Sequence, residues 1–119
     1  MIIRNNEMER VNQENYAGGS GVIEFKAVVP DECLKGEAKI FKVLSFEAGA
    51  GIGDHAHVDN YEIYYILKGK GIAVDNGQEF EVGPGDVVYT ADGATHSIRD
   101  AGNGDLVMLA AVIFENKAN

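Results

Sequence analysis

The sequence predicts an all-β fold, a sandwich or barrel of short strands. Segments rich in β-branched and aromatic residues recur at roughly ten-residue spacing, which is typical of such folds. Fifteen glycines and two prolines in 119 residues supply the turns between them. The apolar residues show no helical period longer than about two turns, so helices are not expected to contribute layers of their own.

Size and charge exclude several classes of protein. One domain, spanning 1–119, is expected from 119 residues, of which 45% are apolar and 24% charged. A net charge of −9 with no basic run argues against a nucleic-acid partner. No apolar run approaches the ~18 residues of a membrane span, and the first residues are polar. The single cysteine, Cys33, excludes an intramolecular disulfide. A cytoplasmic protein without a membrane partner is the expectation.

The first half of the chain predicts an arm followed by strands. Residues 1–20 are polar and end in Gly18-Gly19-Ser20-Gly21, which indicates an N-terminal arm rather than a packed element. Residues 22–29 and 38–46 are rich in strand-forming residues. Between them, residues 30–34 begin with a proline, which suits the first position of a short helical turn. Residues 62–67 are the next expected strand.

The second half predicts a hairpin and three more strands. Residues 71–75 and 78–82 flank Asn76-Gly77, and this dipeptide is a strong hairpin signal because both turn residues must take positive φ. A tight turn is expected over 83–86. Strands are expected over 87–90, roughly 96–99, and 106–114.

The three histidines of the chain carry the first indication of chemistry. His55 and His57 are two residues apart, and on a strand such residues share a face. With the carboxylate of Glu62 they make a set that suits a divalent first-row metal with open positions. A barrel could bring His96 across from a later strand. The alternative is that the histidine pair is a chance pattern on the surface.

A frame of fixed spacing surrounds these residues. It begins Gly49-x5-His55-x-His57-x4-Glu62-x6-Gly69, and after fifteen residues continues Gly85-Asp86-x4-Ala91-x-Gly93-x2-His96-x3-Asp100. This frame resembles the two motifs of the cupin superfamily. It departs from the family pattern at Ala91, where proline is usual, and at Asp100, where asparagine is frequent. Neither departure removes a ligand.

The resemblance implies a single cupin domain, a double-stranded β-barrel of jelly-roll type, with residues 49–100 as its metal-binding region. It implies that His55, His57, Glu62 and His96 bind a divalent transition metal, with Mn, Fe, Zn, Ni and Co all open. It also implies a homodimer, since small cupins usually pair through N-terminal strands. Separately, Gly49, Gly51 and Gly53 are expected to let the chain bend sharply before the histidines.

The parity of neighbouring residues extends the site. Tyr64 and Ile66 share the parity of Glu62, and Ile98 shares that of His96, so all three are expected to line one cavity above the metal. Tyr64 is the candidate catalytic residue, with core packing as its alternative. Two further pairs are open: Asp54 and Asp59 either orient the imidazoles or are solvated, and Lys42 and Arg99 are possible partners for an anionic ligand.

Two functions are consistent with these residues. Four protein ligands in an octahedral shell leave two adjacent positions, which suit a bidentate oxygen ligand. The first hypothesis is a metal-dependent enzyme acting on a dicarboxylate, hydroxy acid, diketone or sugar-like molecule, as a decarboxylase, isomerase or dioxygenase. Similar small cupins are labelled oxalate-decarboxylase-like or mannose-6-phosphate-isomerase-like. The second hypothesis is a binding module that holds a metal or small ligand in the barrel without turnover.

Overall fold

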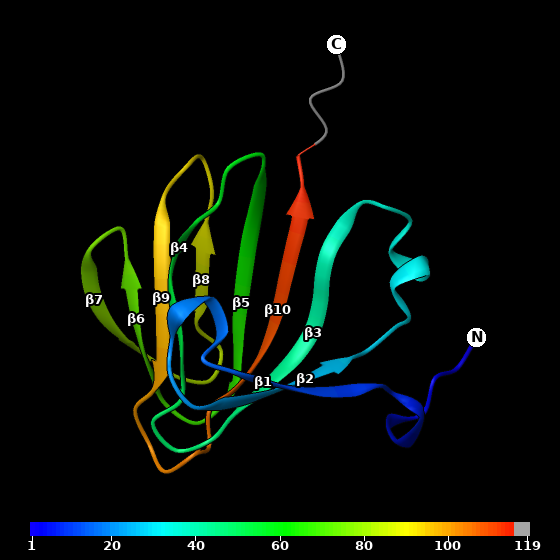
Figure 1. The fold of residues 1–119 in the computed structure, drawn as a ribbon, viewed down its shortest axis with the longest axis horizontal. Coiled ribbons are helices and arrows are strands. Elements are labelled where there is room, and N and C mark those ends of the chain that lie inside the picture. Colours follow the sequence, from blue (N-terminus) through cyan, green and yellow to red (C-terminus); the bar gives the residue numbers. More distant parts are fainter. Residues whose placement is uncertain (116–119) are drawn as a thin grey trace.

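A computed structural model of the chain describes residues 1–115, which form two facing antiparallel β-sheets (Figure 1). The described residues contain ten strands: β1 (Arg10–Glu14), β2 (Val22–Ala27), β3 (Ala38–Phe46), β4 (Gly51–Ala56), β5 (Asn60–Lys68), β6 (Gly71–Asp75), β7 (Gln78–Val82), β8 (Val87–Thr90), β9 (Thr95–Asp100) and β10 (Val107–Phe114). They also contain three short 3-10 helices, η1 (Asn5–Glu7), η2 (Tyr16–Gly18) and η3 (Asp31–Leu34).

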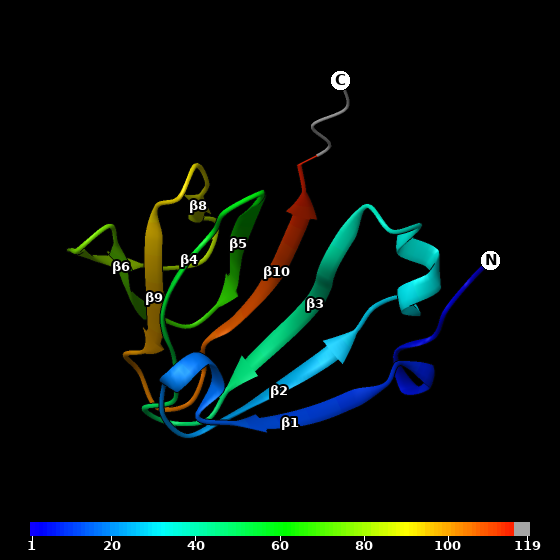
Figure 2. The same cartoon turned by 45° about the horizontal axis from the view of Figure 1, so that its top comes forward.

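The strand order is that of a jelly-roll barrel, as predicted. The larger sheet has the order β1-β2-β3-β10-β5-β8, and the smaller sheet has β4-β9-β6-β7. Figure 2 shows most of the larger sheet as a fan of neighbouring strands. Consecutive strands such as β4 and β5 therefore belong to opposite sheets. This crossing is what brings segments distant in the sequence together inside the barrel.

The core lies between the two sheets, where alternate residues of each strand point inward. The larger sheet contributes Ile23, Phe25, Leu44, Phe46, Ile66 and Met108, and the smaller one contributes Ile52, Ala73 and Ile98. Burying a side chain of this kind stabilises the fold by roughly 1.5–3 kcal/mol each. Tyr64, Ile66 and Ile98, whose parity predicts that they point inward, are all buried.

Most strand predictions are confirmed. The strands over 38–46, 71–75, 78–82 and 87–90 have the predicted ends, and the others differ by two residues or fewer. The turn at Asn76-Gly77 has the expected positive φ values of 50° and 87°. The helical turn after Pro30 is η3. Strand β4 has no clear signal in the sequence, because glycines at 51 and 53 interrupt its apolar pattern.

The expectation of a loose N-terminal arm over residues 1–20 is wrong. Strand β1 pairs with β2 in antiparallel register, from Arg10 opposite Lys26 to Glu14 opposite Val22. Arg10 also forms an ion pair with Glu24 at 3.8 Å. The sequence does not mark β1 because it is a polar edge strand, attached by backbone hydrogen bonds that depend little on side-chain type.

The predicted role of the glycines before the histidines is only partly right. Gly49 lies in a turn with φ +73°, but Gly51 and Gly53 lie within β4 and are not at positive φ. Their side is occupied by other backbone: a Cβ on Gly53 would lie 2.0 Å from the carbonyl oxygen of Ala17. These glycines therefore permit close chain packing rather than a bend.

Within residues 1–115, no helix is long and apolar enough to cross a membrane.

Candidate metal centre

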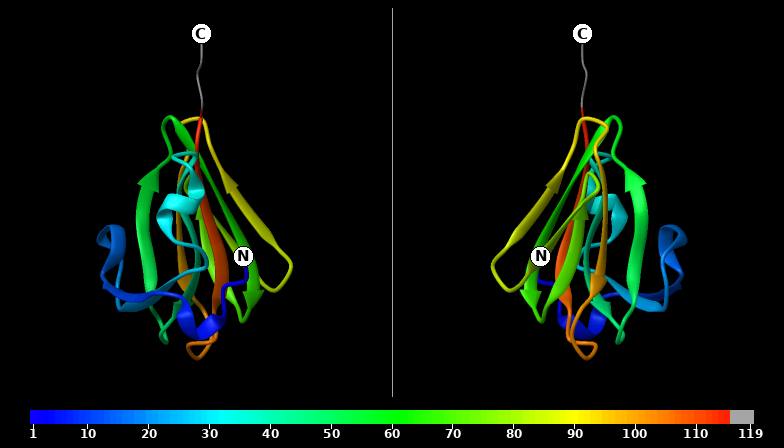
Figure 3. Two further views of the ribbon diagram at one scale, coloured as in Figure 1. Left: turned by 90° about the vertical axis from the view of Figure 1, so that its right-hand side faces the viewer. Right: turned by 90° about the vertical axis from the view of Figure 1, so that its left-hand side faces the viewer.

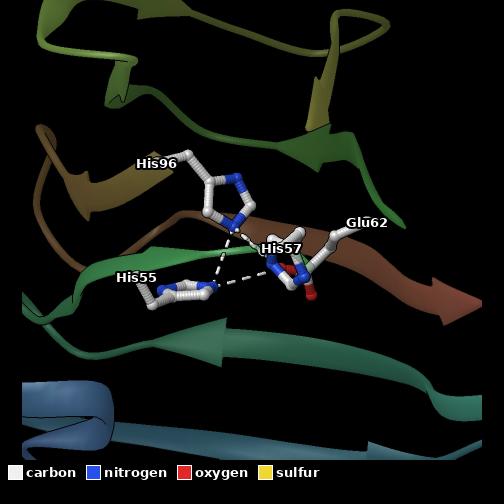
Figure 4. A group of neighbouring side chains, drawn as sticks. All are labelled: His55, His57, Glu62 and His96. Atoms are coloured by element: carbon white, nitrogen blue, oxygen red, sulfur yellow. Dashed lines mark hydrogen bonds and ion pairs between the residues drawn. The ribbon is translucent and has the colours of Figure 1, made fainter. Parts of the chain in front are cut away.

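Four polar side chains from three strand regions meet inside the barrel (Figure 4). His55 lies in β4, directly opposite His96 in the antiparallel register of β4 with β9. His57 follows one residue after β4 ends. Glu62 points inward from β5 of the other sheet. The predicted convergence of these four residues is therefore what the fold produces.

The donor atoms are spaced like ligands around one ion. The Nε2 atom of His96 lies 2.9 Å from that of His55 and 3.1 Å from that of His57. The Glu62 Oε1 atom lies 2.9 Å from both the His57 and the His96 Nε2 atoms, and 3.4 Å from that of His55. All four donors are within 4.8 Å of one another. Ligands 2.0–2.2 Å from a metal at adjacent octahedral corners are about 3 Å apart, so the donor set fits a first-row ion.

Hydrogen bonds on the far side of each ring orient the imidazoles. The His55 Nδ1–H donates to the Gly53 carbonyl oxygen at 2.8 Å, because a carbonyl can only accept. The His57 Nδ1 atom is 2.6 Å from the Asn60 side-chain oxygen, and that of His96 is 2.8 Å from the Thr90 hydroxyl. A proton on Nδ1 of a neutral imidazole leaves the Nε2 lone pair free for a metal. The three Nε2 atoms surround one point next to a carboxylate, and a cation at that point would replace the protons that the imidazoles otherwise share with Glu62.

The electrostatics of the cluster reflect this crowding. Burial raises the pKa of Glu62, but hydrogen bonds from His55 and His96 and the charges of the imidazoles outweigh it and lower the pKa to about 2. Burial lowers the pKa of His55, yet its bonds to Glu62 and Gly53 and the nearby carboxylates raise it overall. Burial dominates for His96, whose pKa is lowered despite Glu62. The carboxylate therefore stays ionised, and His55 holds a proton more readily than His96 does.

A cavity of 280 Å³ opens beside the four donors. Apolar and polar residues both line it. The polar ones are three of the donor residues, His55, His57 and Glu62, together with Tyr16, Lys39, Asn60 and Tyr64. Tyr64 is fully buried and stacks on His96 with ring centroids 4.7 Å apart, and its hydroxyl oxygen lies 3.3 Å from His96 Nε2, within hydrogen-bond distance. Tyr64 thus lies in the site, as its parity predicts.

Other expected site residues lie elsewhere. Ile66 and Ile98 are packed in the core and do not line this cavity, because they lie one step further along their strands. Asp54 and Asp59 are exposed, and the imidazoles are oriented instead by Gly53, Asn60 and Thr90.

The two basic candidates are also outside the cavity. Lys42 lines a different hollow near η1. Arg99 is exposed and forms an ion pair with Glu79 at 3.8 Å.

Three contributors to the site were not predicted. Thr90 faces Glu62 across the β5–β8 ladder, and only the strand pairing reveals it. Asn60 is three residues after His57, a spacing that could have drawn attention to it. Tyr16 comes from the N-terminal segment that the sequence did not place in the fold at all.

Comparisons with known proteins agree with this description. The family model described as "Cupin domain" matches residues 42–112. The "Oxalate-binding protein" of Thermotoga maritima is 36% identical over 113 residues, covering 95% of this chain and 93% of that protein. A crystal structure of a predicted oxalate decarboxylase from Thermotoga maritima superposes with a TM-score of 0.89 at 36% identity, covering 96% of this chain and 99% of that one. KdgF from Halomonas sp. shares the fold alone, with a TM-score of 0.71 at 19% identity, covering 95% of this chain and 94% of that one. By family model, by relative and by strand order, the chain belongs to the cupin superfamily.

Proposed function

We propose that this protein holds a divalent transition metal on His55, His57, Glu62 and His96 and uses it to bind a small dicarboxylate of the oxalate type. The observation that carries the proposal is the set of three imidazole Nε2 atoms and one carboxylate oxygen directed at one point. A divalent cation at that point would be bound by all four atoms. Mn, Fe, Zn, Ni and Co all suit imidazole and carboxylate ligands.

The ligand class follows from the coordination that four donors leave. Five of the six donor pairs are separated by 2.9–3.4 Å, typical of adjacent octahedral corners. Such a set leaves two adjacent positions for two oxygens of one acid. The 280 Å³ cavity lies below the ~300–1,000 Å³ of sites for drug-sized ligands, so the acid must be small. The name of the relative, an oxalate-binding protein, agrees with this class.

Binding without turnover is the function that the cavity supports best. Among the described residues that line it, Glu62 is the only carboxylate, and it belongs to the metal site. General acid catalysis of a decarboxylation needs a further group that delivers a proton near the substrate. Tyr64 is a buried phenol that lines the cavity and contacts His96, and it is what favours the second candidate, a metal-dependent enzyme of decarboxylase, isomerase or dioxygenase type.

The test is a set of calorimetric titrations joined to elemental analysis. We expect about one metal per chain, oxalate binding by the metal-loaded protein, and loss of that binding after chelation. A triple variant, His55→Ala with His57→Ala and His96→Ala, should hold no metal. Unchanged metal content in that variant, or oxalate binding that survives chelation, would contradict the proposal. Turnover of oxalate under the same conditions would favour the enzyme instead.

We also propose that the protein is a homodimer, and the larger sheet offers a face for it. Two rows of cross-strand neighbours cover the outer side of β3, β10, β5 and β8 with uncharged, mostly apolar residues. These rows, the apolar outer face, are Val43-Leu109-Tyr65-Val87 and Phe41-Ala111-Ile63-Tyr89. An outer sheet face is normally polar, as on the neighbouring β2, where Glu24 and Lys26 point outward. In a chain of net charge −9, two copies repel least where they meet through an uncharged face.

Light scattering tests the dimer. The wild type should have twice the mass of the 12.8 kDa chain, and Tyr65→Glu should yield a monomer because it buries a charge at the centre of the apolar outer face. Phe80→Glu, which changes an exposed aromatic residue of β7 in the other sheet, is the matched control and should remain dimeric. A wild-type monomer at micromolar concentration would contradict this proposal.

We infer a cytoplasmic location as well, supported by the free and exposed thiol of Cys33.

A further inference from the structure

The segment of residues 15–20, here called the strap, is laid across β4 next to the metal-site histidines. Figure 3 shows η2, in blue, beside the green strand β4. Ser20 and Gly51 exchange backbone hydrogen bonds of 3.1 and 2.8 Å. The two chains approach so closely that a Cβ on Gly19 would lie 2.0 Å from the Gly51 carbonyl oxygen. The strap is therefore fastened to the strand that carries His55.

The backbone of the strap is unusual on both sides of Tyr16. Asn15 has φ 51° and ψ 42°, and Ala17 has φ 54° and ψ 34°, both in the left-handed region. Asparagine tolerates this region, whereas alanine does so only when the surroundings impose it. Here the Gly18 N–H donates to the Asn15 carbonyl and the Gly19 N–H to the Tyr16 carbonyl, at 3.1 and 2.9 Å. Strain held in place beside a ligand cavity points to a role for the residue between the two strained positions.

The strap turns Tyr16 into the cavity. Its ring packs on the buried Phe25 with centroids 4.8 Å apart, and it lines the cavity together with Glu62 and Tyr64. Burial raises the pKa of Tyr16, and the negative charge of Glu62 raises it further. The Tyr16 phenol also contributes to raising the pKa of Tyr64. Both effects agree with a hydroxyl that lies near the metal-site carboxylate.

We infer that Tyr16 determines ligand specificity: its ring limits the length of the acid, and its hydroxyl donates a hydrogen bond to the acid held at the metal. This inference rests on the proposed function. Tyr64 is already hydrogen-bonded to His96, so Tyr16 is the cavity hydroxyl without a hydrogen-bond partner among residues 1–115. A hydroxyl donor matches the outer carboxylate oxygens that remain after two oxygens have bound the metal. The ligand is thus a dicarboxylate short enough to fit between the four donors and the Tyr16 ring.

Two substitutions of Tyr16 separate these roles, with oxalate, malonate and succinate as probes for the metal-loaded protein. Tyr16→Phe should weaken oxalate binding by roughly 10- to 100-fold, which is the loss of affinity expected when a hydrogen bond to a charged group is removed. The metal content should be unchanged. Tyr16→Ala should raise the affinity for succinate relative to oxalate by at least about tenfold, because the cavity lengthens. Tyr61→Phe is the matched control, because Tyr61 lies in β5 outside both the cavity and the apolar outer face, and this variant should match the wild type.

A change in the strap itself tests the same inference without touching the tyrosine. Gly19→Ala forces the strap off β4 and should alter the preference among the three acids as Tyr16→Ala does. Gly83→Ala, where the nearest atom to a new Cβ is 3.9 Å away, should have no effect. Wild-type affinity for all three acids in Tyr16→Phe and Tyr16→Ala would overturn the inference while leaving the proposed function intact. A metal-loaded wild type that binds none of the acids would overturn both.

Discussion

Replacing Glu62 by glutamine isolates the charge at the centre of the cluster. The substitution keeps the shape of the side chain and removes the carboxylate that faces three imidazoles. The pKa of Glu62 is lowered from 4.5 to about 2 in the folded protein, so its ionised form is favoured by about 3 kcal/mol over the unfolded chain. The group is almost wholly buried, so solvent screening reduces this figure little.

The direction of the pKa shift determines the pH range in which Glu62 contributes to stability. A lowered pKa contributes stability that is fully present above pH 4.5 and is lost as the pH falls toward 2, because the unfolded chain takes up the proton first. In the metal-free protein, Glu62→Gln should therefore lower the free energy of unfolding by about 3 kcal/mol near neutral pH, a drop of roughly 10 °C in Tm. The difference in free energy of unfolding between the wild type and Glu62→Gln should decrease steadily below pH 4.5.

The assay is denaturant unfolding of both proteins in chelator, from about pH 3 to about pH 7. Glu81→Gln, whose carboxylate is 67% exposed and 3.8 Å from the Lys70 ammonium, is the control and should change stability by less than about 1 kcal/mol. Metal content should also fall in Glu62→Gln, since one ligand loses its charge. Parallel pH profiles for wild type and Glu62→Gln would refute the idea that the imidazoles hold this carboxylate ionised.

Three further predictions concern the groups around the donors. Metal binding near pH 6.5 should release up to about one proton, because His55 has a raised pKa and must lose its proton to bind. Calorimetry in two buffers of different ionisation enthalpy measures the number of protons released, and a metal affinity that does not depend on pH would contradict this prediction. Thr90→Val removes the hydrogen-bond partner of the His96 Nδ1 atom and should weaken metal binding by roughly 10- to 100-fold. Thr95→Val is the control and should leave metal affinity unchanged. If the two variants bind metal equally well, Thr90 does not support the site. Asp100 accepts backbone N–H bonds from Gly49 and Gly104, so Asp100→Ala should lower the free energy of unfolding by about 2 kcal/mol and leave the metal content unchanged. Asp100→Asn should restore most of this stability. A loss of metal in either variant would show that the carboxylate acts on the metal site.

Local patterns in the sequence predicted eight of the ten strands found in residues 1–115, together with the four donor residues of the metal site. Alternation marks which side chains point inward, and Asn76-Gly77 marks a hairpin, because both depend only on neighbouring residues. The i, i+2 spacing of His55 and His57 places both side chains on one side of an extended chain, although His57 lies just beyond β4. The fold alone made His96 a possible ligand, and its place in the frame that resembles a known family made it an expected one.

Tertiary structure decided everything that depends on depth and on partners distant in sequence. Ile66 and Glu62 share a parity, yet one packs in the core and the other joins the donors, since alternation encodes the face of a strand and not the position along the barrel. Thr90 reaches His96 only through the pairing of β8 with β5. Strand β1 and the strap lack an apolar pattern because backbone hydrogen bonds and close backbone contact hold them, and neither depends on a repeating side-chain pattern. For this reason Tyr16 could be placed beside the metal-site residues only once the chain was folded.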